Sequence, residues 1–141
     1  IQRAEFYSAY TPYQPEVSQG TLQAIFEFQT MIAGLLGLDV ANASMYDGAS
    51  AAAEAVLMAL RTRPKRTRVL VARSLHPQYL EVIRTYVGDT AIELVDLPWG
   101  PDGRVDLERL RAAADAATAA ILVGYPNAFG VIEDLASIAS I

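Results

Sequence analysis

Cysteine is absent from the 141-residue sequence, and lysine occurs once, as Lys65 between Pro64 and Arg66. Without cysteine the chain forms no disulfide, no thiolate metal site and no cysteine nucleophile. This absence is typical of a reducing compartment, and we expect a cytoplasmic protein. A Schiff-base lysine must point into a shielded pocket. The basic loop around Lys65 is expected to be exposed and does not suit that role.

Long hydrophobic runs and an excess of positive charge are also missing. No apolar run approaches the ~18 residues of a membrane span, and no basic segment followed by an apolar stretch predicts a signal peptide. The net charge of −5 argues against nucleic-acid binding, which needs a basic face. One cluster is basic, in contrast to the acidic chain as a whole, and it consists of Arg61, Arg63, Lys65, Arg66 and Arg68. The favoured interpretation is that these cations stabilise the carboxyl end of a predicted helix. The alternative is a patch that binds a phosphate or a partner.

The remaining composition predicts a folded α/β domain, because 52% of the residues are hydrophobic. Short apolar runs with the character of strands alternate with segments of helical spacing. The strands are expected at 68–72, 91–95 and 119–125, and the helices at 18–36, 47–60, 78–87, 107–117 and from about 133. This alternation predicts βαβ units in a three-layer α/β sandwich. The nearly continuous apolar run 119–125 is typical of a strand buried on both faces of a parallel sheet.

Three clear strands offer little core for such a sandwich, so we expect part of a larger α/β domain from a longer chain. We divide the sequence into an N-terminal arm, 1–20, and a partial large domain, 21–141. The sequence contains no G-x-G-x-x-G after a strand, no Walker A motif and no G-x-S-x-G elbow.

The first candidate site is the turn Asp47-Gly48-Ala49-Ser50, which opens a predicted helix. Free N–H groups at a helix start can hold a phosphate or carboxylate. The alternative is an ordinary helix start capped by Asp47, whose own carboxylate can occupy those N–H groups.

The second candidate is His76, the only histidine, which follows the strand 68–72. Open α/β sheets bind ligands at the carboxyl ends of their strands. A loop histidine before Pro77 is the equally supported alternative. A single histidine without cysteines makes no convincing metal site, and we expect no metal.

The third candidate is the arm, in which prolines separate polar and aromatic groups. Its side chains with functional groups are Tyr10, Tyr13, Gln14 and Glu16. Tyrosines with an apolar body and a hydroxyl group suit interfaces and pockets. The alternative is a surface arm that packs only on its own domain.

Several long segments resemble the P-protein of the glycine cleavage system, in particular subunit 1 of the two-subunit glycine dehydrogenase (decarboxylating). They are YTPYQPEVSQG at 10–20, FQTM at 28–31, GLDVANAS at 37–44, YDGASAAAE at 46–54, and YPN with FGVIED at 125–134. The sequence has Ala128 where the family pattern has a larger aromatic residue. The resemblance covers nearly the whole chain.

The resemblance implies fold type I of the pyridoxal-phosphate enzymes, with this chain as part of the large domain. It implies decarboxylation of glycine and transfer of the aminomethyl group to the lipoyl H-protein. It also implies a bacterial heterotetramer in which the partner, subunit 2, carries the lysine aldimine. The turn Asp47 to Ser50 falls at the family's phosphate-binding turn, and His76 near its ring-stacking position, both possible vestiges in this subunit. The arm residues are then expected to reach the shared active site.

Two other hypotheses remain open. The chain could be a non-catalytic scaffold subunit that stabilises a partner carrying the cofactor. It could also be part of another fold type I enzyme, such as an aminotransferase.

Overall fold

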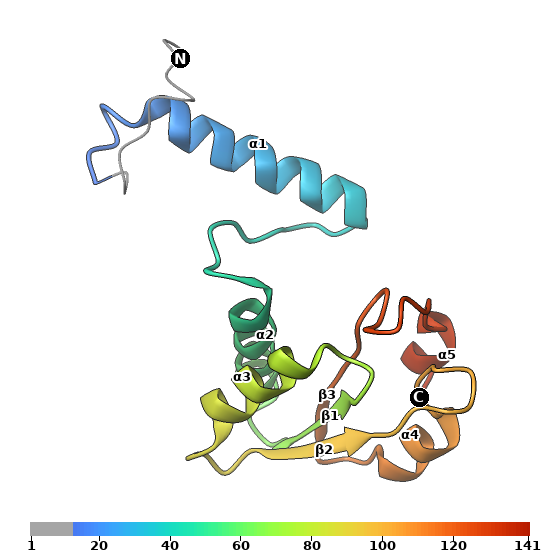
Figure 1. Ribbon diagram of the computed structural model, residues 1–141. Helices are drawn as coiled ribbons and strands as arrows, with labels where there is room; N and C mark the ends of the chain where they lie inside the picture. The colour runs from blue at the N-terminus through green and yellow to red at the C-terminus, as the bar shows by residue number, and fades with distance from the viewer. Residues whose placement is uncertain (1–12) are drawn as a thin grey trace. The chain divides into compact units, whose positions relative to one another are not determined.

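The computed structural model describes residues 13–141 of the chain (Figure 1). The chain forms two compact units, which divide between Met45 and Tyr46.

The first unit contains one long helix, α1 (Gln19–Leu36). Ser18 precedes it as N-cap residue but makes no side-chain cap hydrogen bond. Gly37 ends it in the left-handed region at φ 67°, where its N–H donates to the carbonyl of Ala33. Glycine adopts this conformation without a steric penalty, so the predicted stop at Gly37 is confirmed.

The second unit is built on a three-stranded parallel sheet (Figure 1). The strands are β1 (Arg68–Ala72), β2 (Glu93–Leu97) and β3 (Thr118–Leu122), in the order β2-β1-β3. The central strand β1 pairs Leu70 with Val95 of β2 and with Ile121 of β3. Four of its five residues are buried, so β1 forms the centre of the core.

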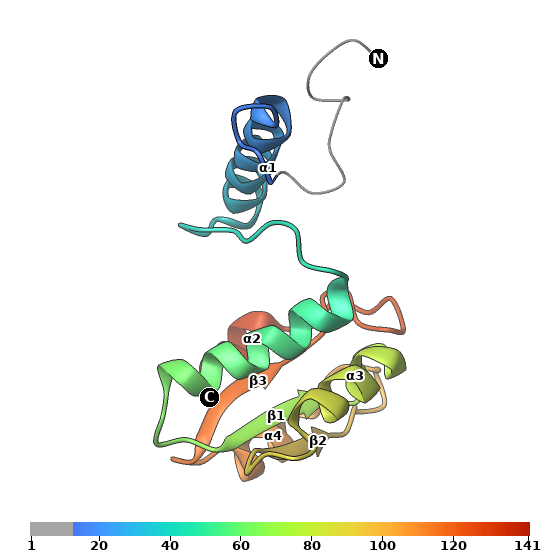
Figure 2. The same cartoon turned by 90° about the vertical axis from the view of Figure 1, so that its left-hand side faces the viewer.

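Helices cover both faces of this sheet. Helices α2 (Gly48–Thr62) and α3 (Pro77–Val87) lie on one face, and α4 (Leu107–Ala113) lies on the other (Figure 2). The short helix α5 (Leu135–Ala139) joins α4 on that second face.

Successive residues of β1 point to opposite faces of the sheet, so two cores alternate along the strand. Val69 and Val71 pack with Val56 of α2 and Ile83 of α3, whereas Leu70 packs with Leu110 and Ile138. The predicted three-layer α/β sandwich is thereby confirmed.

Some element boundaries differ from the prediction. Strand β2 begins two residues later than expected, and the helix from Leu107 ends at Ala113 instead of at 117. That helix ends early because Asp115 and Thr118 form a turn. The Asp115 N–H donates to Thr118 Oγ1 at 3.1 Å, and the Ala117 N–H donates to Asp115 Oδ1 at 2.9 Å.

The composition of the apolar run 119–125 predicts a strand that is buried on both faces of the sheet. The observed strand β3 does not have this burial. It lies at one end of the described sheet, and four of its five residues are only partly buried. Among residues 13–141, no helix is long and apolar enough to cross a membrane.

Candidate functional site

The carboxyl ends of the three strands lie at one edge of the sheet, because the strands are parallel. Segment 73–76 follows β1 at this edge, Trp99 follows β2, and Tyr125 follows β3. In open α/β sheets this is the edge where ligands bind.

The predicted turn at the start of α2 lies at the same edge. Gly48 packs so closely against Tyr79 of α3 that an added Cβ would lie 2.2 Å from the Tyr79 hydroxyl oxygen. Tyr79 is in the first turn of α3 and its ring centroid lies 5.7 Å from that of His76. The fold therefore brings together two candidates that are 26 or more positions apart in the sequence.

Within this turn, Asp47 acts as the N-cap of α2. Its Oδ1 accepts a hydrogen bond of 2.7 Å from the Ser50 N–H. This hydrogen bond is the main cause that lowers the pKa of the Asp47 carboxyl group below its usual value. Ala49 is buried and Gly48 is closed off by Tyr79. The chain's own carboxylate thus occupies an N–H group that a bound phosphate would use.

His76 is exposed and serves as the N-cap of α3. Its Nδ1 accepts a hydrogen bond of 3.3 Å from the Gln78 N–H. Pro77 occupies the first helical position, where its missing N–H costs no hydrogen bond. A local structural role for His76 is therefore visible, and its role toward a cofactor stays a prediction.

Sequence reasoning missed a buried polar cluster beneath this edge. The carboxylate of Glu133 accepts hydrogen bonds from Ser74 Oγ at 3.2 Å, Asn127 Nδ2 at 2.9 Å and the Val105 N–H at 2.9 Å. The side chains of Ser74, Asn127 and Glu133 are all buried. A buried carboxylate is tolerated when donors surround it in this way.

Asn127 extends this cluster to the loop that follows β3. Its Oδ1 accepts hydrogen bonds from the N–H groups of Phe129 and Val131, and its Nδ2 also donates to the Gly103 carbonyl. The cluster therefore ties the loops after β1, β2 and β3 to one another. The signal in the sequence is an asparagine and a glutamate shortly after an apolar strand, a pattern too common to predict this cluster.

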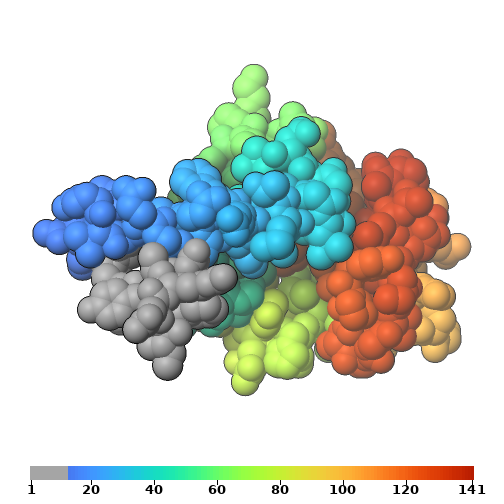
Figure 3. Space-filling model, turned by 90° about the horizontal axis from the view of Figure 1, so that it is seen from above, coloured from blue at the N-terminus to red at the C-terminus, as the bar shows by residue number. Residues whose placement is uncertain are grey.

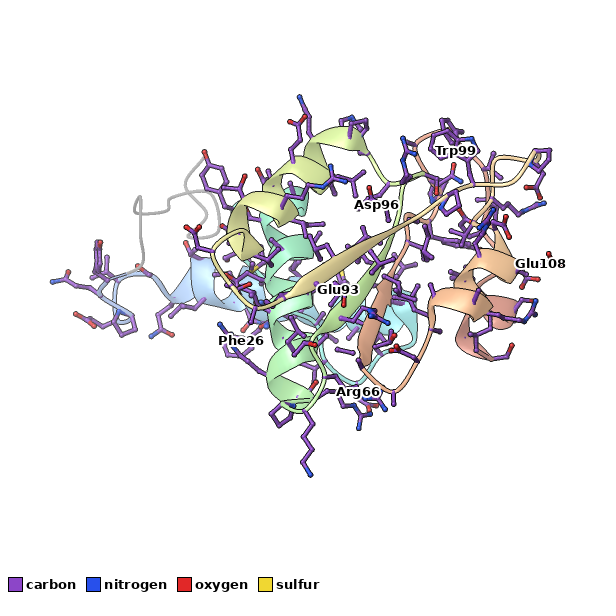
Figure 4. All side chains as sticks on the ribbon, turned by 90° about the horizontal axis from the view of Figure 1, so that it is seen from below. Phe26, Arg66, Glu93, Asp96, Trp99 and Glu108 are labelled. Carbon is purple, nitrogen blue, oxygen red and sulfur yellow. The ribbon has the colours of Figure 1, made fainter. Side chains whose placement is uncertain are left out.

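Aromatic side chains line the outer side of the same edge. Trp99, which is labelled in Figure 4, packs edge-on against Phe129 with ring centroids 5.1 Å apart. The Arg73 guanidinium lies 5.4 Å from the centroid of the Trp99 ring. Phe129 and Tyr125 are more than half exposed on the loop after β3, in the orange-red region of Figure 3. The edge thus combines a rigid buried support with an exposed aromatic surface.

The basic cluster lies around the opposite edge of the sheet, before β1 begins. Arg68 pairs with Glu93 and Asp115, and Arg66 Nη1 donates to the Thr118 carbonyl at 2.6 Å. Arg61 is in the last turn of α2, as the helix-end interpretation predicted.

Lys65 is exposed in the loop that precedes β1. Strand β1 lies between Lys65 and His76. Its five residues span roughly 16 Å, at about 3.3 Å per residue. Lys65, the single lysine of these 141 residues, therefore does not lie at the carboxyl edge.

Of the arm, Tyr13, Gln14 and Glu16 fall within the described residues, whereas Tyr10 lies outside them. The Gln14 carbonyl accepts hydrogen bonds from the N–H groups of Val17 and Ser18 at 3.1 and 3.0 Å. Tyr13 is 85% exposed and Glu16 is exposed, so both side chains are available for contacts. Within residues 13–141, no group of three or more metal-ligating side chains is present.

Comparison with known proteins places this arrangement in a family. The sequence pattern of the family described as "Glycine cleavage system P-protein" matches residues 1–141. Two curated relatives from Anaeromyxobacter (strains Fw109-5 and 2CP-C) are 55% identical over 141 residues, which is all of this chain. Both are named "Probable glycine dehydrogenase (decarboxylating) subunit 1". The chain spans 32% of the length of each.

Two solved structures share the fold. A glycine decarboxylase (P-protein) of the glycine cleavage system, in inhibitor-bound form, has a TM-score of 0.85 and 51% identity, covering 98% of this chain and 30% of that one. A Burkholderia pseudomallei sphingosine-1-phosphate lyase has a TM-score of 0.76 at 21% identity, covering 97% of this chain and 34% of that one. The predicted fold type I architecture is confirmed.

Proposed function

Because this chain belongs to the P-protein family of the glycine cleavage system, we propose that it is part of subunit 1 of a glycine dehydrogenase (decarboxylating). In this proposal the assembled enzyme decarboxylates glycine and transfers the aminomethyl group to the lipoyl H-protein. The observation that carries the proposal is the 55% identity over the whole chain to relatives of that name. The bacterial cytoplasm is the proposed location.

The cofactor is proposed to lie in subunit 2 of a heterotetramer. Lys65 is the only lysine of these 141 residues, and it lies at the end of β1 opposite to His76. Asp47 already holds the N–H of Ser50 at the start of α2. Both features support the proposal that subunit 2 holds pyridoxal phosphate as an aldimine and that this chain does not.

The contribution of this chain to the active site is proposed to come from its arm. Glu16 presents a carboxylate in a turn held by the Gln14 carbonyl, and Tyr13, directly before this turn, presents a hydroxyl group. Glycine offers few groups for recognition, so each well-placed polar contact should affect the rate. Tyr10 and Gln14 complete the proposed set of arm residues.

A non-catalytic scaffold role is the second candidate. It is favoured by the way in which Asp47 and His76 cap their own helices, because both groups are then used for local structure. The aminotransferase hypothesis is set aside by the family match over residues 1–141.

The test uses a chimera in which residues 1–141 replace the matching segment of subunit 1 from Anaeromyxobacter strain Fw109-5. The chimera is combined with subunit 2 and H-protein from the same organism, and glycine-dependent exchange of labelled bicarbonate is measured. We expect exchange within about tenfold of the natural pair, because most residues of the segment are shared.

Two controls separate the possible causes of failure. Omitting subunit 2 should abolish exchange, and light scattering should report whether the two subunits assemble. Exchange that is lost while assembly is normal would contradict the proposed function. Exchange that survives without subunit 2 would contradict the proposed location of the cofactor.

A further inference from the structure

The basic cluster is larger than the end of helix α2 requires. Five of the chain's 11 lysine and arginine residues fall within positions 61–68, although the net charge of the chain is −5. The carboxyl end of a helix carries about half a negative elementary charge. Arg61, in the last turn of α2, is enough to balance that charge. Arg63 and Lys65 lie beyond the helical residues and need another explanation.

The cations of this cluster differ in what they contact. Arg68 is held by two carboxylates, and Arg66 donates to a backbone carbonyl. By contrast, Arg61, Arg63 and Lys65 are exposed, and none of them forms an ion pair within the described part of the chain. Three positive charges at this edge of the sheet are therefore left without a neutralising side chain among the described residues.

The turn that carries two of these cations is fixed by hydrogen bonds. It runs from Arg63 to Arg66 and is closed by a 2.8 Å hydrogen bond from the Arg66 N–H to the Arg63 carbonyl. Pro64, the second residue of the turn, restricts its backbone. Directly after the turn, the Thr67 N–H donates to the Ala117 carbonyl at 3.1 Å. A surface that is preorganised in this way loses less conformational entropy when a partner binds.

The composition of the cluster indicates the kind of partner. Positions 61–68 contain only arginine, lysine, threonine and proline. Without aromatic side chains the segment lacks the groups on which single-stranded nucleic acid stacks, and the acidic chain as a whole repels phosphates. Without large apolar side chains it also lacks the hydrophobic contacts typical of permanent subunit interfaces. Exposed charges mainly raise the rate of association, which suits an acidic protein that binds and leaves in each turnover.

The cluster is separated from the edge at which the candidate site lies. Arg66 precedes β1 and Trp99 follows β2, and the two lie at opposite ends of the sheet (Figure 4). A contact at the cluster therefore does not use the residues of the carboxyl edge. We infer that Arg61, Arg63 and Lys65 form a docking surface for an acidic face of a transiently bound protein. Within the proposed function, on which this choice of partner rests, that protein is the lipoyl H-protein.

The test measures the binding of fluorescently labelled H-protein to the chimera assembled with subunit 2, by stopped-flow anisotropy at about 50 mM and about 500 mM salt. Arg63→Gln combined with Lys65→Gln removes two positive charges. At the lower salt we expect this variant to associate about tenfold more slowly and to bind about tenfold more weakly. At the higher salt the difference should shrink to less than about twofold, because exposed charges are screened.

Two further variants serve as controls. Arg109→Gln combined with Arg111→Gln removes the same charge at the same spacing from exposed positions of α4. Its affinity for H-protein should stay within about twofold of that of the unchanged chimera, since screened charges act over about 10 Å. Arg63→Lys combined with Lys65→Arg keeps both charges and should keep the affinity, which separates a loss of charge from a defect in folding.

The outcomes distinguish this inference from the proposed reaction. Equal affinities of the Arg63→Gln, Lys65→Gln variant and the α4 control would overturn the inference, and so would a chimera that binds no H-protein. Binding of a single-stranded RNA that depends on Arg63 and Lys65, with H-protein binding unchanged, would assign the cluster to nucleic acid and also overturn it.

Bicarbonate exchange at saturating H-protein is measured beside binding. Normal exchange with binding that is unaffected by the two substitutions rejects this inference alone. Absent exchange with binding that depends on Arg63 and Lys65 rejects the proposed reaction alone.

Discussion

Asn127 Nδ2 donates a hydrogen bond of 2.9 Å to Glu133 Oε1, and both side chains are buried. Glu133 lies six positions after Asn127 in the loop between β3 and α5. Their contact fixes the shape of the loop that presents Tyr125 and Phe129. Glu133 also accepts from Ser74, which follows β1, so one carboxylate holds segments from different parts of the chain.

Glu133→Ala should destabilise the folded chain by about 3 kcal/mol, because three buried donors would lose their acceptor. Glu133→Gln should cost less, since one oxygen remains to accept a hydrogen bond. Urea unfolding of the chimera, followed by circular dichroism, gives the free energies of unfolding. The matched control is Glu81→Ala on the exposed side of α3, which should change stability by less than about 0.5 kcal/mol. An equal effect of the two alanine variants would contradict the role of the buried cluster.

Stability should fall as the pH drops below about 4, and Asp47 should contribute to this loss. Hydrogen bonds from Ser50 lower the pKa of Asp47 in the folded chain below its usual 3.8. A group with a lowered folded pKa contributes stability that is present above the unfolded pKa and is lost as the pH falls through the folded pKa. Asp47→Asn should therefore lower stability at pH 7 more than at pH 3.

The measurement for Asp47 is urea unfolding at pH 7, 5 and 3. Asp89→Asn, in the exposed turn after α3, is the matched control and should change stability by less than about 0.5 kcal/mol. An Asp47→Asn variant whose stability follows the same pH curve as the control would disprove the cap contribution.

Lys65 should form no specific adduct with pyridoxal phosphate. It is exposed in the loop before β1 and lies far from the carboxyl edge. The experiment is borohydride reduction of the chimera with subunit 2 and pyridoxal phosphate, followed by peptide mass spectrometry. We expect a stoichiometric adduct on subunit 2 and at most trace labelling of Lys65. A stoichiometric adduct on Lys65 would overturn the proposed division between the subunits.

Tyr13→Phe and Glu16→Gln should each lower glycine–bicarbonate exchange by roughly tenfold to a hundredfold in the assembled chimera. This range corresponds to the loss of one hydrogen bond to a charged group in the transition state, about 1.5–3 kcal/mol. Tyr86→Phe is the matched control, because Tyr86 lies in the last turn of α3, at the other end of the helix from His76, and should leave the rate unchanged.

Assembly of each arm variant is measured by light scattering beside its activity. Normal assembly with a reduced rate would support the arm as part of the active site. Unchanged rates in both variants would reject that role and favour a scaffold subunit. Rates that fall only together with assembly would reduce the arm to an interface element.

The sequence by itself determined the fold class and most element boundaries. Alternating strand and helix periodicities predicted a parallel α/β unit, and local signals at Asp47 and Gly37 located helix ends. These features depend on residues close together in the chain, so they can be recognised without knowledge of the fold. The single lysine likewise predicts that these 141 residues supply no Schiff-base lysine, and this stays a prediction.

Only the tertiary structure decided which polar residues meet and which strand is central. The apolar run at 119–125 predicted a fully buried strand, but burial depends on neighbours, and β1 took the central position. Ser74 and Glu133 are 59 positions apart, and no local pattern brings them together. Likewise, the close approach of Gly48 to Tyr79 results from the packing of α2 on α3, and this packing placed the turn and His76 at one edge.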